Sequence, residues 1–498
     1  MPRAIDPRSE GSLTSKPHPR RWTCKNQPRD IDVMSIDMLP DDILLDIFDF
    51  YVNARRWIEE WQTLVHVCQR WRSVAFGSPR RLNLRLFCSN KTPARDILDV
   101  WPALPLSIRC NGSTKGVDNI IAVLKRSDRV FHINLERIES WSLEEILAAM
   151  QEPFPELTHL HLWPNGDETV SILPDSFLGG SVPRLEYLEL NRIPFPGLPT
   201  LLLSATHLVS LSLYDIPYSG YFSSDAMATA LSTLTRLNSL TLHFVSPPSQ
   251  SRPDQSRQPP PPPTRSVLPA LTLFWFKGVS EYLEVVVARI DAPRLHQFFI
   301  TFFNDIVFDT PQFTQFIGCT PMLKPLEMAW VTFNDNAATV MLLSQTSGKD
   351  VEVNIPCREL DWQVSSMQQV CTSCLPPLPT LEYLYIHESP YWRQHWQGNI
   401  ESALWLELLH PFTSVKNLHL SEHIARRIVP ALQELVGGRT TEVLPALQNI
   451  LLNEHQPSGP VQEGIQQIVS VRQAIGHPIA VSYGQVVSIT VKGRPGSY

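Results

Sequence analysis

The sequence predicts an α/β fold in which a short N-terminal helical unit is followed by an irregular solenoid of parallel strands with helical returns. Two observations support this prediction. Apolar residues recur at three- and four-residue steps between Ile36 and Phe76, which is the spacing of an amphipathic helix. Beyond them, the motif L-x-x-L-x-L returns many times along the chain, as it does in stacked repeats.

The composition limits the classes of protein to which the chain could belong. It has 498 residues, of which 43% are hydrophobic and 18% charged, so a large core is expected. The net charge of −7 argues against a dominant role with nucleic acid or at an anionic membrane, because those roles use dense Lys and Arg surfaces. Eight scattered cysteines are too few for a disulfide scaffold. Neither a secretory signal nor a run of about 18 apolar residues is found, so we expect a cytoplasmic or nuclear location.

Residues 35–80 contain two stretches of helical spacing, and each is expected to form one helix. The first begins at Pro40, where proline is tolerated, and Asp41 and Asp42 favour the positive end of the helix. The second ends at Gly77, before Ser78 and Pro79. The apolar positions are Leu39, Ile43, Leu44, Ile47, Phe48 and Tyr51 in the first stretch, and Leu64, Val67, Cys68, Trp71, Val74 and Ala75 in the second.

Residues 1–34 are rich in Pro, Arg, Ser and Lys and are expected to form a disordered arm. Its basic stretch, residues 16–21, fits either a solvated tail or a nuclear-import signal. A second segment of this kind, residues 246–266, contains Pro259 to Pro263 in a row. Such a composition cannot pack, so we expect an extended disordered insertion. It fits either an exposed insertion or a docking site for a proline-reading domain.

The repeated motif is expected to form short parallel strands. Its second and third leucines would point inward, the residues between them would point outward, and the rest of each unit would return to the next strand. The clearest copies start at residues 157, 185, 208 and 237, which are 28, 23 and 29 residues apart, in or near the leucine-rich-repeat range of roughly 20–29. Weaker copies are residues 130–135, 271–276, 295–300, 381–386, 415–420 and 447–452, with another expected to start at Leu323. Residues 81–457 would form this solenoid, although 303–378 is too degenerate to divide.

The last segment, residues 458–498, is expected to form a C-terminal cap and tail. A helix is predicted over 461–475, and a short strand is predicted near 479–482. A terminal element of this kind would cover the last apolar face of a repeat array.

The helical unit resembles an F-box. The similarity rests on Ile36-Asp-Met-Leu-Pro-Asp-Asp-Ile-Leu-Leu-Asp-Ile-Phe48 and on Leu64-Val-His-Val-Cys-Gln-Arg-Trp-Arg-Ser-Val-Ala75. Together with the repeats that follow, the chain is similar to fungal F-box proteins with irregular leucine-rich repeats. The segment 51–61 departs from the pattern because it is longer and more aromatic than expected between two F-box helices.

The resemblance implies a role without catalysis. The F-box would bind the Skp-type adaptor of a Skp–cullin–F-box ubiquitin ligase, and the repeats would present a target protein. The adaptor-binding residues it implies are Leu39, Pro40, Ile43, Leu44, Ile47, Phe48, Leu64, Val67 and Trp71. Some of these side chains would instead form the core of the helical unit, and the sequence does not divide them. The alternative is a non-catalytic repeat scaffold whose F-box-like hairpin recruits no ligase.

The target would bind the outward side chains of the repeat strands. This row is rich in Tyr, His and Trp, which dominate protein-binding hot spots. The expected contacts are His159, His161, Trp163, Tyr187, Glu189, Tyr214, His243, Phe299, Tyr383, Tyr385 and His387. The other interpretation is that loops cover some of these residues. No arginine cluster stands out on this face in the sequence.

No established catalytic motif is found in the sequence. It contains no phosphate-binding glycine loop, no H-E-x-x-H and no G-x-S-x-G, so an enzyme, a cofactor and a metal site are not expected. Cys371-x-x-Cys374 has the spacing of a zinc or redox motif but lacks further ligands, so we expect two reduced surface thiols in a loop. An enzyme that uses this region is the remaining alternative.

Overall fold

The computed structural model describes residues 36–54, 61–91, 98–112, 116–166, 170–245, 265–303, 310–323, 326–344, 350–375, 379–388, 401–435, 439, 441–452 and 459–484. The predicted N-terminal arm and residues 246–264 of the predicted insertion lie outside these residues. The chain divides into two compact units, Met1–Asn83 and Leu84–Tyr498, and each is described by itself.

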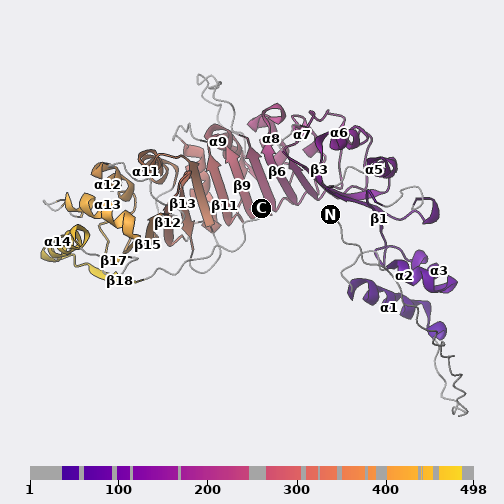
Figure 1. Cartoon of the computed structure of the whole chain (residues 1–498), viewed down its shortest axis with the longest axis horizontal. Helices are drawn as coiled ribbons and strands as arrows, with labels where there is room; N and C mark the ends of the chain where they lie inside the picture. The colour runs from indigo at the N-terminus through magenta and orange to yellow at the C-terminus, as the bar shows by residue number, and fades with distance from the viewer. Residues whose placement is uncertain are drawn as a thin grey trace, which may run out of the picture. The chain divides into compact units, whose positions relative to one another are not determined.

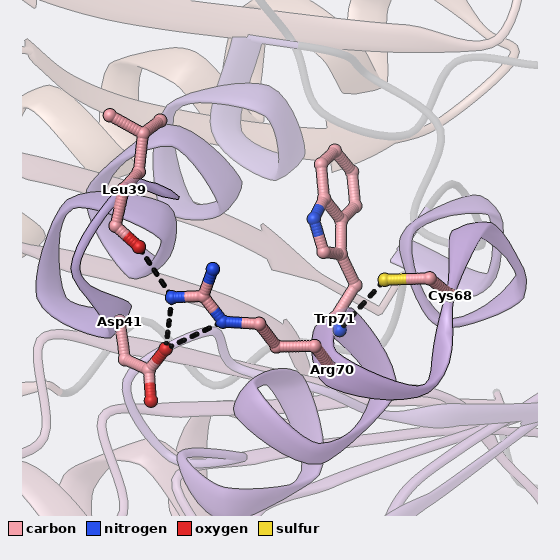
Figure 2. Close-up of polar contacts among 5 residues, drawn as sticks. All are labelled: Leu39, Asp41, Cys68, Arg70 and Trp71. Atoms are coloured by element: carbon pink, nitrogen blue, oxygen red, sulfur yellow. Dashed lines mark hydrogen bonds and ion pairs between the residues drawn. The ribbon is translucent and has the colours of Figure 1, made fainter. Parts of the chain in front are cut away.

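The first unit is helical. Its elements are η1 (Ile36–Met38), α1 (Asp41–Ala54), α2 (Trp61–Val67) and α3 (Gln69–Gly77). As predicted, α1 begins behind Pro40, whose carbonyl accepts a hydrogen bond from the Leu44 amide at 3.1 Å. The prediction of one helix over 64–75 was wrong. Cys68 adopts an extended conformation, with φ −154° and ψ 171°, and its Sγ accepts a hydrogen bond from the Trp71 amide at 3.5 Å, so α3 starts anew (Figure 2).

An arginine fixes the start of α1 to α3. Arg70 donates from Nη2 and Nε to Asp41 Oδ1, at 2.7 and 3.2 Å, and from Nη2 to the backbone carbonyl of Leu39 (Figure 2). The core beneath consists of buried side chains from all three α-helices. Phe48 and Trp71 pack with ring centroids 4.8 Å apart.

The second unit is built on a 16-stranded sheet, with helices between most strands. The strands are β1 (Leu86–Cys88), β2 (Leu106–Asn111), β3 (Val130–Ile138), β4 (His159–Pro164), β5 (Tyr187–Asn191), β6 (Ser210–Ile216), β7 (Ser239–Phe244), β9 (Leu273–Gly278), β11 (Gln297–Phe302), β12 (Met328–Phe333), β13 (Ala337–Leu343), β14 (Asp350–Pro356), β15 (Tyr383–Glu388), β16 (Asn417–Leu420), β17 (Asn449–Leu452) and β18 (Ala480–Tyr483). The strands from β1 to β11 pair in chain order, and all these pairings are parallel. A separate pair joins β8 (Ser266–Val267) to β10 (Ile290–Asp291).

The helices of the second unit follow one another along one side of the sheet, as Figure 1 shows for α5 to α9. They are α5 (Val117–Leu124), α6 (Ser140–Ala148), α7 (Leu198–Leu202), α8 (Ser224–Leu231), α9 (Ser280–Arg289), α10 (Pro311–Cys319), α11 (Leu360–Gln369), α12 (Ser402–Leu409), α13 (Glu422–Gln433) and α14 (Pro460–Ala474). Short helical turns are η2 (Phe177–Gly180), η3 (Tyr218–Gly220), η4 (Pro321–Leu323) and the π-turn η5 (Val370–Cys374). The apolar core lies between these helices and the inward side chains of the sheet.

The strands expected from the clear and weak repeat copies are confirmed, and the predicted parallel pairing is confirmed for them. In the copy at 157–162, for example, β4 begins two residues after the first leucine. Leu157, Leu160 and Leu162 are all buried, while His159 and His161 alternate with them. The predicted C-terminal helix and strand are also confirmed as α14 and β18. The latter adds a further parallel strand beside β17.

The sheet departs from chain order after β11. The neighbour of β11 is β14, followed by β13, β12 and β15. Among the described strands of this sheet, only the pairings of β13 are antiparallel. Strand β12 therefore lies three positions away from β11 in the sheet. The two positions between them are occupied by β13, which forms a hairpin with β12, and by β14.

The repeat copy expected at Leu323 was placed three residues too early. The register Met328↔Tyr383 aligns Leu326 with Leu381, so the structural copy runs from Leu326 to Val331. Leu323 belongs to η4 instead. The inward positions of this copy are occupied by Ala329 and Val331. Because neither is a leucine, the copy does not match L-x-x-L-x-L and could not be found from the sequence.

A buried glutamine supports the β12–β13 hairpin. Asn334 Oδ1 accepts hydrogen bonds from the amides of Asn336 and Ala337 within the turn, at 2.9 and 2.8 Å. From α11, Gln363 Nε2 donates to the carbonyls of Asn334 and Cys357, at 2.8 and 2.7 Å. The Gln363 side chain is fully buried, so these bonds connect the turn to the end of β14 within the core.

Candidate functional site

The outward side chains of the 16-stranded sheet form the main candidate site, which we call the sheet face. They alternate with buried residues and lie in register across the strands. One row runs through Asn134, His161, Glu189, Ser212, Thr241, Trp275, Phe299, Glu352, Met341, Trp330, Tyr385 and His419. Parallel pairing thus places residues far apart in the sequence next to one another.

The first aromatic group lies on β4 to β11 and consists of Trp163, Tyr214, His243, Trp275 and Phe299. Consecutive ring centroids in that order are 5.9, 5.3, 4.6 and 6.2 Å apart. Such edge and offset contacts hold each ring in one orientation. The rings of this group therefore contact one another in sequence across β4 to β11.

The second aromatic group lies on β12, β15 and β16 and consists of Trp330, Tyr383, Tyr385, His387 and His419. The Tyr385 ring lies between Trp330 and His419, with centroid distances of 4.3 and 4.1 Å and nearly parallel planes. Trp330 also meets His387 edge-on at 5.2 Å. Strands β13 and β14 separate this group from the first.

Burial keeps several histidines of the sheet face uncharged near neutral pH. It lowers the pKa of His243 to about 4, and Lys277 acts in the same direction. The pKa of His387 and of His419 is likewise lowered by burial. These imidazoles therefore offer one donor and one acceptor each, without positive charge.

Five polar atoms of the sheet face are buried and have no hydrogen-bond partner in the described part of the chain. They are Asn134 Oδ1, His161 Nε2, His243 Nε2, Trp330 Nε1 and His419 Nδ1. A buried polar atom without a partner is costly, and a bound ligand is one way in which such atoms become paired. The last four lie in or beside the two aromatic groups.

Polar and charged residues of the sheet face lie in contact around the first aromatic group. His161 Nδ1 lies 3.0 Å from Glu189 Oε2. Asp215 lies between Arg192 and Lys277, at 3.6 and 3.9 Å. Both Arg192 and Asp215 have positive φ, at 53° and 49°, in the equivalent place two residues after the last leucine of their repeat. At Asp215 this conformation coincides with a shift in the register of β6 with β7, between Leu213 and Ile216.

All eleven residues expected to contact a target lie on strands of the sheet, on β4, β5, β6, β7, β11 and β15. Trp163 and Tyr187 are exposed, and most of the others are half-buried. His243 differs from the expectation of an exposed side chain, since it is only 8% exposed between the rings of Tyr214 and Trp275.

The residues of this face that the sequence-based selection missed include Trp275, His132 and Trp330. Trp275 occupies the outward position of the 271–276 copy and could have been found from the motif alone. His132 occupies the other outward position, two residues earlier in the motif, of the degenerate 130–135 copy, and pairs with His159 across β3 and β4. Trp330 was missed because the Leu323 register placed it outside the motif.

The helical unit provides a second candidate site. Ile43, Ile47 and Phe50 of α1 are spaced i, i+4 and i+7, which places them along one side of the helix. They are 45%, 40% and 76% exposed. Met38, Val67 and Pro40 are also exposed. We call Met38, Ile43, Ile47, Phe50 and Val67 the apolar stripe.

The structure divides the nine residues that the resemblance implied for adaptor binding. Three are buried in the helical core, Leu44, Phe48 and Leu64. Leu39 and Trp71 are half-buried, and the remaining four are exposed. Met38 and Phe50 were not selected from the sequence, although Phe50 continues the spacing of Ile43 and Ile47.

The Cys371-x-x-Cys374 segment differs from the prediction of surface thiols in a loop. Both cysteines are buried in η5, the π-turn that continues α11. Burial raises the pKa of Cys371 to about 12 and that of Cys374 to about 11, so both thiols are protonated and poor nucleophiles. The sequence could not show this, because Ser and Thr between the cysteines resemble a loop.

Two further searches cover the described residues. Among them, no group of three or more His, Cys, Asp or Glu side chains is arranged to hold a metal ion. None of the helices in these ranges combines the length and the apolar character needed to cross a membrane.

Comparison with known proteins adds no further assignment. No protein-family model matches the sequence. No curated protein is similar enough in sequence to count as a match.

Proposed function

We propose that this chain is a substrate-receptor subunit of a Skp–cullin–F-box type ubiquitin ligase, which acts without a cofactor or catalytic centre of its own. The helical unit would be the F-box and would bind a Skp-type adaptor. The 16-stranded sheet with its helices would be an irregular leucine-rich-repeat solenoid that binds a target protein. In this proposal the protein works in the cytoplasm or nucleus.

The apolar stripe is the observation that carries the proposal. A helical unit of this size buries little apolar surface by itself. Large apolar side chains that stay in water therefore contribute nothing to its stability. Exposed apolar side chains along one side of a helix, such as Ile43, Ile47 and Phe50, are typical of protein interaction sites. The stripe adjoins Leu39 and Pro40, the two residues for which the F-box resemblance implies direct contact.

The two aromatic groups support the second half of the proposal. Aromatic side chains with polar tips dominate protein-binding hot spots, and pre-ordered rings lose little entropy when a partner binds. The buried unpaired atoms of His161, Trp330 and His419 would find partners in a bound polypeptide.

Adaptor binding provides the test. A purified Skp-type adaptor is immobilised, and binding of the wild-type chain is compared with that of Leu39→Ala/Pro40→Ala and of Ile43→Glu/Ile47→Glu. Each isoleucine is about half exposed, so its loss removes about 1 kcal/mol of apolar burial, and each glutamate adds a desolvation cost. We expect the Glu variant to bind at least about a hundredfold more weakly.

A matched control shares the chemistry of the change. Ile172→Glu/Leu203→Glu places two charges at equally exposed apolar residues of the second unit, at 55% and 46% exposure, and should bind the adaptor as the wild type does. Circular dichroism and limited proteolysis establish that each variant is folded. If the folded wild-type chain does not bind the adaptor, the receptor proposal is wrong and a scaffold that recruits no ligase remains.

A further inference from the structure

A basic cluster forms at the β1–β4 end of the sheet face. In the register of these strands, Phe87, Ser107, His132 and His159 form one row. Arg85 precedes Phe87 by two residues, and Arg109 follows Ser107 by two. Because side chains alternate along a strand, both arginines share the face of this row. The sequence alone did not indicate such a cluster.

The neighbouring rings and hydroxyl fix the members of the cluster in place. The guanidinium carbon of Arg85 lies 4.4 Å from the Phe131 ring centroid, and that of Arg109 lies 5.4 Å from the Phe87 centroid. Ser107 Oγ, which is buried, lies 2.9 Å from His132 Nδ1. This contact occupies Nδ1, so Nε2 is the nitrogen left to meet a ligand.

The groups that act electrostatically on His132 all have the same sign. They are Arg109 from β2, His159 and His161 from β4, and Arg85 before β1. On the same strand, Glu136 accepts hydrogen bonds from Asn111 and Asn134, at 3.1 and 2.9 Å. Burial first, and then Arg109, lower the pKa of His132 to about 4. Within the described residues, no carboxylate lies within ion-pair distance of Arg109.

We propose that this cluster binds an anionic oxygen group, a carboxylate or a phosphate, carried by the protein segment that docks on the sheet face. Arg109 would donate to the anion as the principal ligand, His132 would donate from Nε2, and Arg85 would add positive potential. The inference deepens the proposed target-binding function and rests on it. Charge-assisted hydrogen bonds of this kind are among the strongest polar contacts in proteins.

The test uses three fluorescein-labelled peptides of equal length in a Gly/Ser background. One carries three consecutive Glu, one three phosphoserines and one three Gln. Binding to the full chain is measured by fluorescence anisotropy. We expect one or both anionic peptides to bind and the Gln peptide to bind at least tenfold more weakly. The tighter anionic peptide identifies which of the two groups the site takes.

The decisive variant is Arg109→Gln, with Arg236→Gln as its control. Both arginines are exposed and both changes remove one charge, but Arg236 lies outside the sheet face. Loss of one charge-assisted contact should weaken binding of the anionic peptide about tenfold. Binding to the control variant should change less than twofold.

A second readout follows the imidazole itself. A bound anion favours the charged form of His132, so its pKa, measured by NMR of ¹³C-labelled histidines, should rise when the peptide saturates the site. The inference is wrong if no peptide binds, if the Gln peptide binds equally, if both arginine variants weaken binding alike, or if the pKa of His132 is unchanged on binding. Since no adaptor is present in these experiments, failure of adaptor binding leaves their outcome interpretable.

Discussion

Replacing Gln363 by Met should loosen the β12–β13 hairpin and, with it, the strand that presents Trp330. Gln363→Met keeps the length and volume of the side chain but removes the amide that donates to the carbonyls of Asn334 and Cys357. The Gln363 side chain is fully buried, whereas Asn334 and Cys357 are partly buried, so water replaces the lost donor at these carbonyls only in part. The hairpin turn and the end of β14 would then lose these two hydrogen bonds to α11.

The magnitude follows from three groups. Each carbonyl left without its donor costs about 1–3 kcal/mol. The Gln363 side-chain oxygen itself lacks a hydrogen-bond partner in the described residues. The variant removes this oxygen, which stabilises the fold by about 1–3 kcal/mol. The net loss of local stability should therefore be about 1–3 kcal/mol, since one of the two carbonyl penalties remains uncompensated.

Hydrogen exchange measured by mass spectrometry reports this locally. A loss of about 1–3 kcal/mol should accelerate exchange of the amides of Asn336 and Ala337 roughly five- to a hundredfold. Gln369→Met, the same change at a half-buried position of the same helix, should leave them unchanged. Equal exchange in Gln363→Met and the wild type would show that the two hydrogen bonds do not hold the hairpin.

Two further predictions concern the second unit. Burial lowers the pKa of His243 in the folded chain to about 4, from 6.5. Between these two pH values the unfolded chain therefore binds more protons than the folded chain. The contribution of His243 to stability is complete above about pH 6.5 and falls as the pH drops toward 4. The loss of stability due to this residue is at most about 3 kcal/mol. The variant His243→Phe, which keeps the ring contact with Trp275, should flatten the dependence of the denaturation midpoint on pH. An equally steep profile would argue against His243 as the source. Gly220→Ala should destabilise the unit by about 1–3 kcal/mol, because its new Cβ would lie 2.6 Å from the Pro194 Cα. Gly484→Ala, which has open space around its new Cβ, should leave the thermal unfolding temperature unchanged. Equal unfolding temperatures for the two alanine variants would contradict this close contact.

Much of the second unit could be predicted because one local signal repeats. In a motif such as Leu185 to Leu190, alternation of leucine with polar residues sets which side of the strand is buried, and this depends on the chain alone. The same alternation identified the outward residues Tyr187 and Glu189. Where the inward positions became Ala329 and Val331, the signal faded and the register was placed three residues too early.

The sequence by itself determined the helical N-terminal unit, the parallel strands and the alternation of outward side chains, because these follow from the spacing of apolar residues. The tertiary structure decided which residues meet. It placed Tyr385 between Trp330 and His419. It buried Cys371 and Cys374 in a π-turn where the sequence predicted a loop. It also broke the expected second helix at Cys68. It also brought Arg109 to His132 and separated the exposed Ile43 and Ile47 from the buried Leu44 and Phe48. Such contacts depend on pairing order, register and helix packing between distant segments, which local spacing does not encode.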